Sequence, residues 1–313
     1  MSVLRFEWDR VTRHQWQALL ARTPCSGLQQ GWAYGEALAA SGVAVHRLVA
    51  YDDGGVAVGC AQFAMRRLLG VVPAAFLLRG PVWSTAIVEP GWEPALIAAV
   101  RARAGGGFLI WAPETLAASR RRRPVVTGYS TSWLDLDRPT AVLRRSLHGK
   151  WRHQLSQAER RSLEVQSVGR EEDLPWLLAA NEAQRRKVGY RGPGPVFLAR
   201  LAHAAAASGD HLLLIAREGG EPVAGILLIR HGAAATYEVG HVTARGRQLG
   251  AKHLLLWHAL GLLAERGVRR LDLGGIDTER APGLARFKLG LGGEVRTLPG
   301  TFLVSSCRHN NSS

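Results

Sequence analysis

The residues best placed to do chemistry lie in a basic stretch near the end of the chain. This stretch, TARGRQLGAK at residues 243–252, is predicted to be a loop that runs into the start of a helix. Backbone N–H groups at a helix start, beside Arg245, Arg247 and Lys252, form a place to hold a phosphate. A solvated surface turn in an arginine-rich protein would have the same composition. The loop by itself leaves both interpretations open.

Two strands and one helix must position this loop. Strands are predicted at residues 235–242 and 269–273, on either side of a helix at residues 251–266. The leucines of this helix recur at spacings that place them on one face: Leu254, Leu255, Leu262 and Leu263. Gly267 marks the helix end, because glycine accepts the left-handed backbone of a helix cap. The loop is therefore expected where a strand meets a helix with an apolar face.

The predicted elements occur in the same order in both halves of the chain. That order is helix, helix, strand, Gly-rich turn, strand, strand, helix, strand. In the first half the elements are predicted at residues 12–22, 30–41, 46–52, 56–69, 74–78, 92–104 and 108–111. In the second half they are predicted at residues 173–187, 196–208, 211–217, 223–230, 235–242, 251–266 and 269–273. The halves share little sequence, so the pattern indicates two similar α/β domains in tandem, each with a mixed sheet.

A basic helix is predicted to link the two halves. It follows a predicted strand at residues 125–136 and runs from Pro139 through Arg161. Its apolar residues step by four: Leu143, Leu147, Trp151 and Leu155. Its many arginines are expected to form a solvated face. The expected division is a first domain at residues 1–138, a linking helix and crossover at 139–170, and a second domain at 171–313.

The charge of the chain restricts the class of partner. Its 313 residues carry 40 Lys and Arg against 25 Asp and Glu, a formal net charge of +15. This excess favours a polyanionic partner such as nucleic acid, a nucleotide-linked substrate or an anionic membrane surface. Because Arg greatly outnumbers Lys, a GC-rich coding bias also contributes.

Targeting and metal signals are absent from the sequence. No run is apolar enough to span a membrane, and the N-terminus is charged throughout, so a cytoplasmic protein is expected. The three cysteines, Cys25, Cys60 and Cys307, have no CxxC spacing, and the 11 histidines show no HExxH pattern. No metal site is expected.

The element order, with a phosphate loop before the helix, resembles the GNAT acyltransferase fold, whose loop has the form R/Q-x-x-G-x-G/A. RQLGAK matches at Arg247 and Gly250 but has Lys252 where Gly or Ala is usual, which argues against ordinary coenzyme A binding. An ordered set of motifs resembles a narrower family, the FemABX aminoacyl-tRNA-dependent aminoacyltransferases: LQQGWAYGEAL, RGP, SWLDL, SLHGKWRHQLSQAER, ATYEVG, LLLWHAL, RLDLGGID and LARFKLGLGG. The chain lacks the long helical-hairpin, coiled-coil insertion of some members and so resembles the shorter ones.

This resemblance implies roles for particular residues. Phe287 and Lys288 match the acyl-transfer centre, Lys150 and Arg152 match positions that contact the acceptor, and Tyr237 matches an aromatic residue near the cleft. The phosphate and tRNA contacts fall on the loop: Arg245, Arg247, Gly250 and Lys252. Lys288 is expected to donate to the tetrahedral oxyanion or to the ester-bearing end of the tRNA, a contribution of roughly 2–4 kcal/mol in comparable sites. Pairing of Lys288 with a nearby carboxylate is the alternative. The general base stays open among Asp272, Asp277, Glu238 and His241, and an activated ester that is well aligned could also react with little help from a base.

The implied activity is peptide-bond formation between the aminoacyl group of a charged tRNA and an amine of a peptide-like acceptor. The acceptor is a cell-wall precursor, which can be nucleotide-linked, or a peptide natural product such as an antibiotic. The donor serves as a co-substrate, and no separate cofactor is expected. Two alternatives remain: an acyl-CoA-dependent N-acyltransferase of the same fold, and a non-catalytic RNA-binding protein. The sequence leaves the oligomeric state open, and a monomer is compatible with it.

Overall fold

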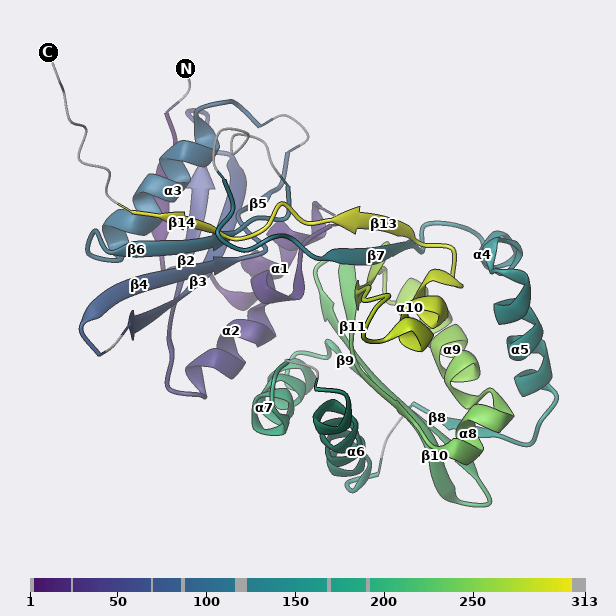
Figure 1. The fold of residues 1–313 in the computed structure, drawn as a ribbon. Helices are drawn as coiled ribbons and strands as arrows, with labels where there is room; N and C mark the ends of the chain where they lie inside the picture. The colour runs from purple at the N-terminus through teal and green to yellow at the C-terminus, as the bar shows by residue number, and fades with distance from the viewer. Residues whose placement is uncertain are drawn as a thin grey trace, which may run out of the picture. The chain divides into compact units, whose positions relative to one another are not determined.

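The chain folds into two compact α/β units (Figure 1). The computed structural model describes residues 3–23, 25–68, 70–85, 88–115, 123–167, 170–189 and 192–305, so Cys307 lies outside the described residues. The first unit consists of Met1–Tyr129 together with Thr297–Ser313, and the second unit consists of Ser130–Arg296. No helix in the described ranges has the length and apolar character needed to cross a bilayer.

The first unit is built on a mixed seven-stranded sheet. Its strands are β1 (Arg5–Trp8), β2 (Ala44–Tyr51), β3 (Ala57–Leu68), β4 (Val72–Leu78), β5 (Val82–Trp83), β6 (Phe108–Ala112) and β14 (Phe302–Val304). The order along the sheet is β1-β2-β3-β4-β6-β14, and β5 pairs with β3. The pair β4 and β6 is parallel, and the other neighbours are antiparallel.

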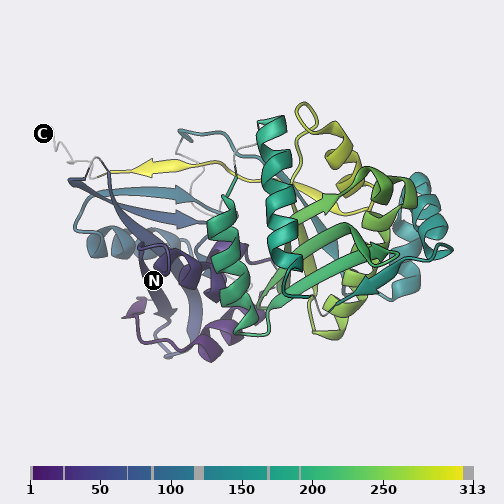
Figure 2. The same cartoon turned by 90° about the horizontal axis from the view of Figure 1, so that it is seen from below.

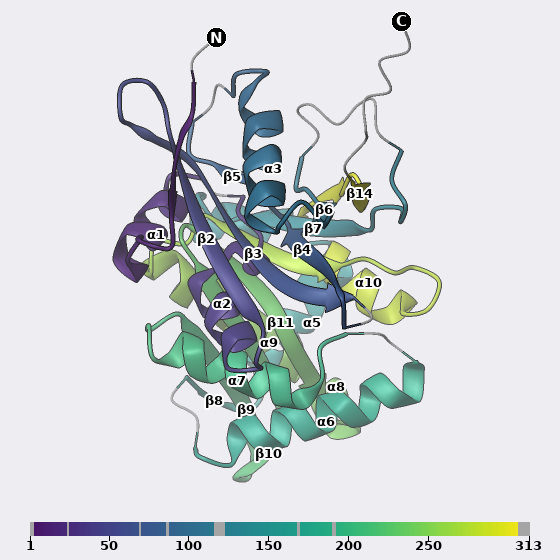
Figure 3. The ribbon, with the colours of Figure 1, turned by 90° about the vertical axis from the view of Figure 1, so that its left-hand side faces the viewer.

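Helices cover both faces of the first sheet (Figure 3). They are α1 (Arg13–Ala21), the short 3-10 helix η1 (Leu28–Gln30), α2 (Trp32–Ala39) and α3 (Trp92–Arg103). Because successive strand residues point to opposite faces, Val49 packs with Trp16 of α1 while its neighbour Leu48 packs with Leu96 of α3. The sheet therefore has two apolar layers, one on each side.

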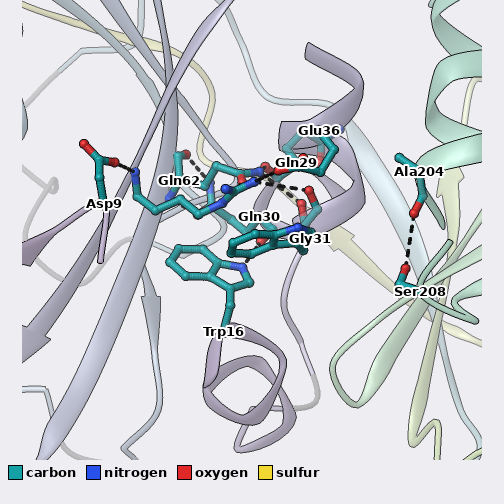
Figure 4. A network of polar contacts seen from close by, with 11 residues as sticks. Asp9, Trp16, Gln29, Gln30, Gly31, Glu36, Gln62, Ala204 and Ser208 are labelled. Atoms are coloured by element: carbon teal, nitrogen blue, oxygen red, sulfur yellow. Dashed lines mark hydrogen bonds and ion pairs between the residues drawn. The ribbon is translucent and has the colours of Figure 1, made fainter. Parts of the chain in front are cut away.

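The motif LQQGWAYGEAL forms η1 and most of α2, and its glutamines hold these elements against β3 (Figure 4). The Gln30 side chain is fully buried, donates to the carbonyls of Gln62 (2.9 Å) and Leu78 (2.7 Å), and accepts from the Gln62 N–H (2.8 Å). The Arg47 guanidinium donates to the Gln62 side chain at 2.8 Å and stacks on the Trp32 ring at 3.5 Å. This opening motif thus forms a structural network around Gln30, although the buried Gln29 Oε1 has no hydrogen-bond partner among the described residues.

The second unit is built on another mixed seven-stranded sheet. Its strands are β7 (Ser130–Asp135), β8 (Glu164–Gln166), β9 (His211–Glu218), β10 (Glu221–His231), β11 (Ala234–Val242), β12 (Arg270–Gly275) and β13 (Glu294–Thr297). The order is β13-β7-β12-β11-β10-β9-β8, and β11 and β12 form the parallel pair.

The helices of the second unit divide between the two faces of its sheet (Figures 1 and 2). They are α4 (Thr140–Ser146), α5 (Gly149–Glu159), α6 (Asp173–Val188), α7 (Pro195–Ala206), α8 (Ala244–Leu249), α9 (Ala251–Glu265) and α10 (Pro282–Leu289). The buried leucines of α9 join Leu212 and Leu214 of β9 in one core with α4 and α5. On the other face α6 and α7 lie side by side, and Trp176 of α6 contacts β11 through His241.

The predicted repeat is present: each unit has two helices, three strands, a helix and a strand parallel to the third. The division of the chain, however, differs from residues 1–138, 139–170 and 171–313. β7 follows the first-unit elements in sequence but pairs with β12, and β14 follows the second-unit elements but pairs with β6. The sheets exchange strands, so strand pairing rather than sequence order sets the division at residues 129/130 and 296/297.

The single linking helix predicted from Pro139 through Arg161 is wrong, because the structure has two helices there, α4 and α5. Leu147 and His148 between them are extended, with ψ of 136° and 141°. The His148 N–H donates to the Gly290 carbonyl at 2.9 Å, which takes it out of a helical ladder. The apolar stripe itself is confirmed, since all four of its members are buried: Leu143, Leu147, Trp151 and Leu155.

Candidate active site

The candidate site begins where the parallel strands β11 and β12 stop pairing. Their register covers only Ala234–Thr236 against Arg270–Asp272, although β11 continues to Val242 and β12 to Gly275. In the first unit β4 and β6 pair over five residues, to the end of both strands. In the second unit, the backbone groups of β11 and β12 beyond the Thr236–Asp272 pair are therefore not hydrogen-bonded to each other and can bind other partners.

Glu238 sits on a β-bulge just beyond the last parallel pair. On the other edge of β11, Leu228 faces Tyr237 and Leu227 faces Val239, so Glu238 is the extra residue. A bulge re-aims a side chain locally and is common beside active sites. Burial and the nearby Asp272 carboxylate raise the pKa of Glu238 to about 7, against the lowering effect of the Lys288 ammonium. Glu238 is thus a carboxyl group that changes charge near neutral pH.

Lys288 projects from α10 into this region. Its side chain is buried, and its Nζ donates to the Gly275 carbonyl of β12 at 2.9 Å. Gly274 beside that Nζ adopts φ 75°, the left-handed backbone that favours glycine, and a Cβ there would be in ordinary contact with the Nζ at 3.4 Å. Burial and the Lys252 ammonium lower the pKa of Lys288 to about 8, while Asp272 and Glu238 act in the opposite direction. Lys288, the residue predicted from the sequence, is thus a buried cation whose pKa is influenced by the Glu238 carboxyl group.

Of the remaining base candidates, Asp272 and Asp277 are engaged in hydrogen bonds, whereas the buried His241 Nδ1 has no partner among the described residues. Asp272 is buried and accepts hydrogen bonds from the Thr131 hydroxyl and from the Gly274 N–H (2.8 Å). Asp277 is exposed and accepts from the N–H groups of the loop that follows it, at 3.1 and 2.8 Å. His241 packs edge-on against Trp176, and burial lowers its pKa. Glu238 is therefore the carboxyl group of this set best suited to accept a proton.

Phe287 belongs to an aromatic cluster beside Lys288. Its ring lies 5.9 Å from Trp151 of α5 and 5.0 Å from His253 of α9, and Trp151 and His253 are 4.9 Å apart. The Trp151 indole N–H donates to the Phe287 carbonyl at 3.1 Å. Burial and the Lys252 charge lower the pKa of His253 to about 4, so the imidazole is neutral at physiological pH. This cluster fixes α10 against α5 and α9.

Lys252 lies between aromatic rings. Its Nζ is 4.8 Å from the centre of the Phe287 ring and 5.5 Å from that of Tyr237, within reach of a cation–π interaction. Burial and Arg247 lower the pKa of Lys252 to about 8. The buried Tyr237 hydroxyl has no hydrogen-bond partner among the described residues, and burial raises its pKa. Lys252 therefore packs with Tyr237 and Phe287 in one group.

The predicted loop before α9 is wrong: residues 244–249 form the helix α8. The Thr243 side chain caps it by accepting from the Gly246 N–H at 3.0 Å, and the Arg247 N–H bonds to the Thr243 carbonyl. Gly250 ends it at φ 70°, and a Cβ there would lie 3.1 Å from Ala158 of α5. Much of the backbone expected to cradle a phosphate is thus engaged in a helix, and Gly250 serves close packing.

The other predicted contacts lie on the surface. Arg245 is paired with Glu218 at 2.6 Å, and exposed Arg247 donates to the Val242 carbonyl at 3.2 Å. Lys150 and Arg152 are exposed in the first turn of α5, on either side of the buried Trp151. The structure therefore groups Lys288, Phe287, Tyr237 and Lys252 and leaves the other predicted residues outside this group. Glu238 lies beside this group because of the β-bulge, which no sequence pattern predicted.

This architecture defines an acyltransferase fold of the GNAT type. Residues 144–289 match the family model described as acetyltransferase (GNAT) domain. The whole tandem arrangement is similar to that of FemX, whose crystal structure aligns with a TM-score of 0.78 at 15% identity, covering 95% of this chain and 96% of that chain. The tandem GNAT-like, FemABX-like fold expected from the sequence is confirmed.

Other solved structures share the fold more distantly. The C-terminal domain of a putative lysylphosphatidylglycerol synthetase from Agrobacterium fabrum has a TM-score of 0.55 at 14% identity, covering 94% of this chain and 91% of that chain. A tandem GNAT protein from the clavulanic acid biosynthesis pathway has a TM-score of 0.53 at 16% identity, covering 96% and 98%. No curated protein matches the chain by sequence.

Proposed function

We propose that the chain is an aminoacyltransferase that joins the aminoacyl group of a charged tRNA to an amine of a peptide-like or nucleotide-linked acceptor. The observation that carries this proposal is that buried Lys288, held on the Gly275 carbonyl, and the Glu238 carboxyl on the bulge influence each other's charge where β11 and β12 part. Charged tRNA is found in the cytoplasm, which makes a cytoplasmic setting part of the proposal.

In this mechanism Glu238 and Lys288 act on the same carbonyl group. The acceptor amine attacks the ester carbon, the C–N bond forms, and the Glu238 carboxylate accepts a proton from the nitrogen. The Lys288 ammonium donates to the oxyanion, a contribution of about 2–4 kcal/mol. The ester C–O bond then breaks, and the ribose oxygen leaves as a hydroxyl with the proton that Glu238 holds. Donor and acceptor thus become an amide and a deacylated tRNA, and the enzyme regains its starting charge.

Three features support tRNA as the donor over coenzyme A. Lys252 occupies the loop position where Gly or Ala is usual, and its side chain lies against the ring of Phe287. The segment expected to cradle a pyrophosphate is helical in α8. The net charge of +15 favours a polyanion larger than a single nucleotide. Lys150 and Arg152, exposed at the start of α5, remain the proposed acceptor contacts.

An acyl-CoA-dependent N-acyltransferase is the second candidate. The acetyltransferase description of the matching family model and the shared fold of the tandem GNAT protein favour it. A non-catalytic RNA-binding protein is the third candidate, and the charge alone would suit it.

The test is transfer of label from a pool of radiolabelled aminoacyl-tRNAs to candidate acceptor peptides, with and without ribonuclease. We expect ribonuclease-sensitive transfer that falls about 100- to 1,000-fold in kcat in Lys288→Met, as for loss of an oxyanion donor. Lys187→Met is the control, because Lys187 is an exposed lysine in the last turn of α6. Transfer that needs only acyl-CoA would overturn the tRNA donor, and full turnover of Lys288→Met would remove Lys288 from the mechanism.

A further inference from the structure

A basic cavity lies on the second unit where the end of α5, the β9–β10 turn and α8 meet. Its volume is about 590 Å³. Three arginines line it, Arg160 and Arg161 from the end of α5 and Arg245 from α8, together with a single carboxylate, Glu218. Gly219, at φ 57° with open space where a Cβ would be, adds no side chain to the turn side of the cavity. The cavity is therefore open and has an excess of positive charge.

Two of the three guanidinium groups are held in place. Arg161 donates to the Gln248 carbonyl of α8, and Arg245 is bound by both oxygens of Glu218, at 2.8 and 2.6 Å. Within the described residues no carboxylate pairs with Arg160 or Arg161. A guanidinium fixed before binding loses little freedom on binding, and its planar fork matches the oxygens of a phosphate. The cavity is thus suited to a phosphate group.

The cavity is close to the candidate active site along the chain. Leu249 lines the cavity, and Lys252, three residues later, contacts the ring of Phe287. Three residues span at most about 10 Å between Cα atoms. A stacked nucleic acid strand rises about 3.4 Å per nucleotide, so this span corresponds to about three nucleotides.

We propose that this cavity binds a backbone phosphate of the RNA that carries the acyl group, a few nucleotides before the esterified ribose. This inference rests on the proposed aminoacyl transfer and assigns the donor a path, from Lys288 past Lys252 and along α8 to the arginines at the end of α5. Glu218 limits the affinity, because its carboxylate occupies Arg245 and repels an incoming phosphate.

The test uses deacylated tRNA as the probe and measures its affinity for the full chain by fluorescence anisotropy over a range of salt concentrations. Removal of one arginine that binds a phosphate reduces the slope of log K against log salt by about 0.7–0.9. We expect this reduction in Arg160→Ala, whose side chain is exposed, and about twice this reduction in Arg160→Ala/Arg161→Ala. Arg10→Ala is the control, since it removes an exposed arginine from the first unit. An equal change in the control would show that only total charge matters and would overturn the proposal.

Glu218→Gln gives a result of opposite sign. It removes the negative charge from the cavity and retains a hydrogen-bond acceptor for Arg245, so we expect tRNA to bind about two- to five-fold more tightly, the range of exposed charge pairs. Unchanged or weaker binding in a variant that melts like the wild type would contradict a phosphate in the cavity.

Kinetics separate this inference from the proposed function. If the wild type transfers the aminoacyl group, Arg160→Ala should raise the KM for charged tRNA and leave kcat unchanged. An unchanged KM would contradict phosphate binding in the cavity but not the proposed aminoacyl transfer. If the wild type binds tRNA through the arginines and transfers nothing, the proposed function fails while the cavity stands. Free coenzyme A that displaces tRNA from the wild type but not from Arg160→Ala would show that the phosphate belongs to coenzyme A and would overturn the RNA assignment.

Discussion

The pH dependence of kcat/KM is the sharpest consequence of the electrostatic coupling between Glu238 and Lys288. The proposed mechanism needs Glu238 as a carboxylate, with a pKa of about 7, and Lys288 as an ammonium, with a pKa of about 8. The rate therefore rises as the pH passes 7 and falls as it passes 8. With these values about three fifths of the enzyme is competent at pH 7.5, and about one tenth at pH 6 or pH 9.

Two variants assign the limbs of this profile. Glu238→Gln should lower the rate about 100- to 10,000-fold and abolish the acid limb, because no carboxylate remains to titrate. Lys252→Met removes a positive charge that lowers the pKa of Lys288, so the alkaline limb should move to higher pH. The methionine retains an apolar stem beside the ring of Phe287.

The assay is initial-rate transfer at low substrate concentration between pH 5.5 and 9.5, with two acceptors whose amines differ in pKa. A limb that belongs to the enzyme stays in place when the acceptor changes. An acid limb that persists in Glu238→Gln would refute the role of Glu238. An alkaline limb that vanishes in Lys252→Met, where a shift is expected, would assign that limb to Lys252.

Four further variants test the packing of the second unit. Gly240→Ala should destabilise the protein by about 1–3 kcal/mol in thermal melting, because its Cβ would lie 1.6 Å from the Tyr237 hydroxyl, whereas Gly261→Ala in α9, with open space at its Cβ, should be neutral or stabilising. Tyr237→Phe should leave the melting temperature unchanged, since the hydroxyl has no partner among the described residues, so any loss of transfer would place that hydroxyl on the substrate. Arg217→Met should cost about 3–5 kcal/mol in denaturant unfolding, because it leaves the buried Asp173 carboxylate unpaired, and a smaller loss would show that water reaches the carboxylate.

Periodicity and turn residues predicted much of the fold. The apolar spacing in α9, its end at Gly267 and the order of elements in each half depend on local sequence, and the structure retains all three. The strand exchange depends instead on which edges pair in space. The local sequence of β7 or β14 does not show whether its partner strand lies in the same half of the chain or in the other half.

The site was predictable only in part for the same reason. Lys288 and Phe287 belong to a recognisable motif, and both lie in the site. The bulge at Glu238 is a register shift between β10 and β11, which is a property of the strand pair. The break at His148 depends on a hydrogen bond to Gly290, more than a hundred residues away. Arg247 belonged to a motif for a loop, but a cap at Thr243 turned that segment into a helix.

The return of β14 to the first sheet sets an order for biosynthesis. Every strand of the second unit precedes residue 298, whereas the first sheet needs Phe302, which is buried and packs 5.6 Å from Trp111 on β6. On the ribosome the edge of β6 therefore stays uncovered until β14 has left the exit tunnel. The unit that begins synthesis first is the one completed last. A chain that stalls before Phe302 would expose a strand edge available for aggregation.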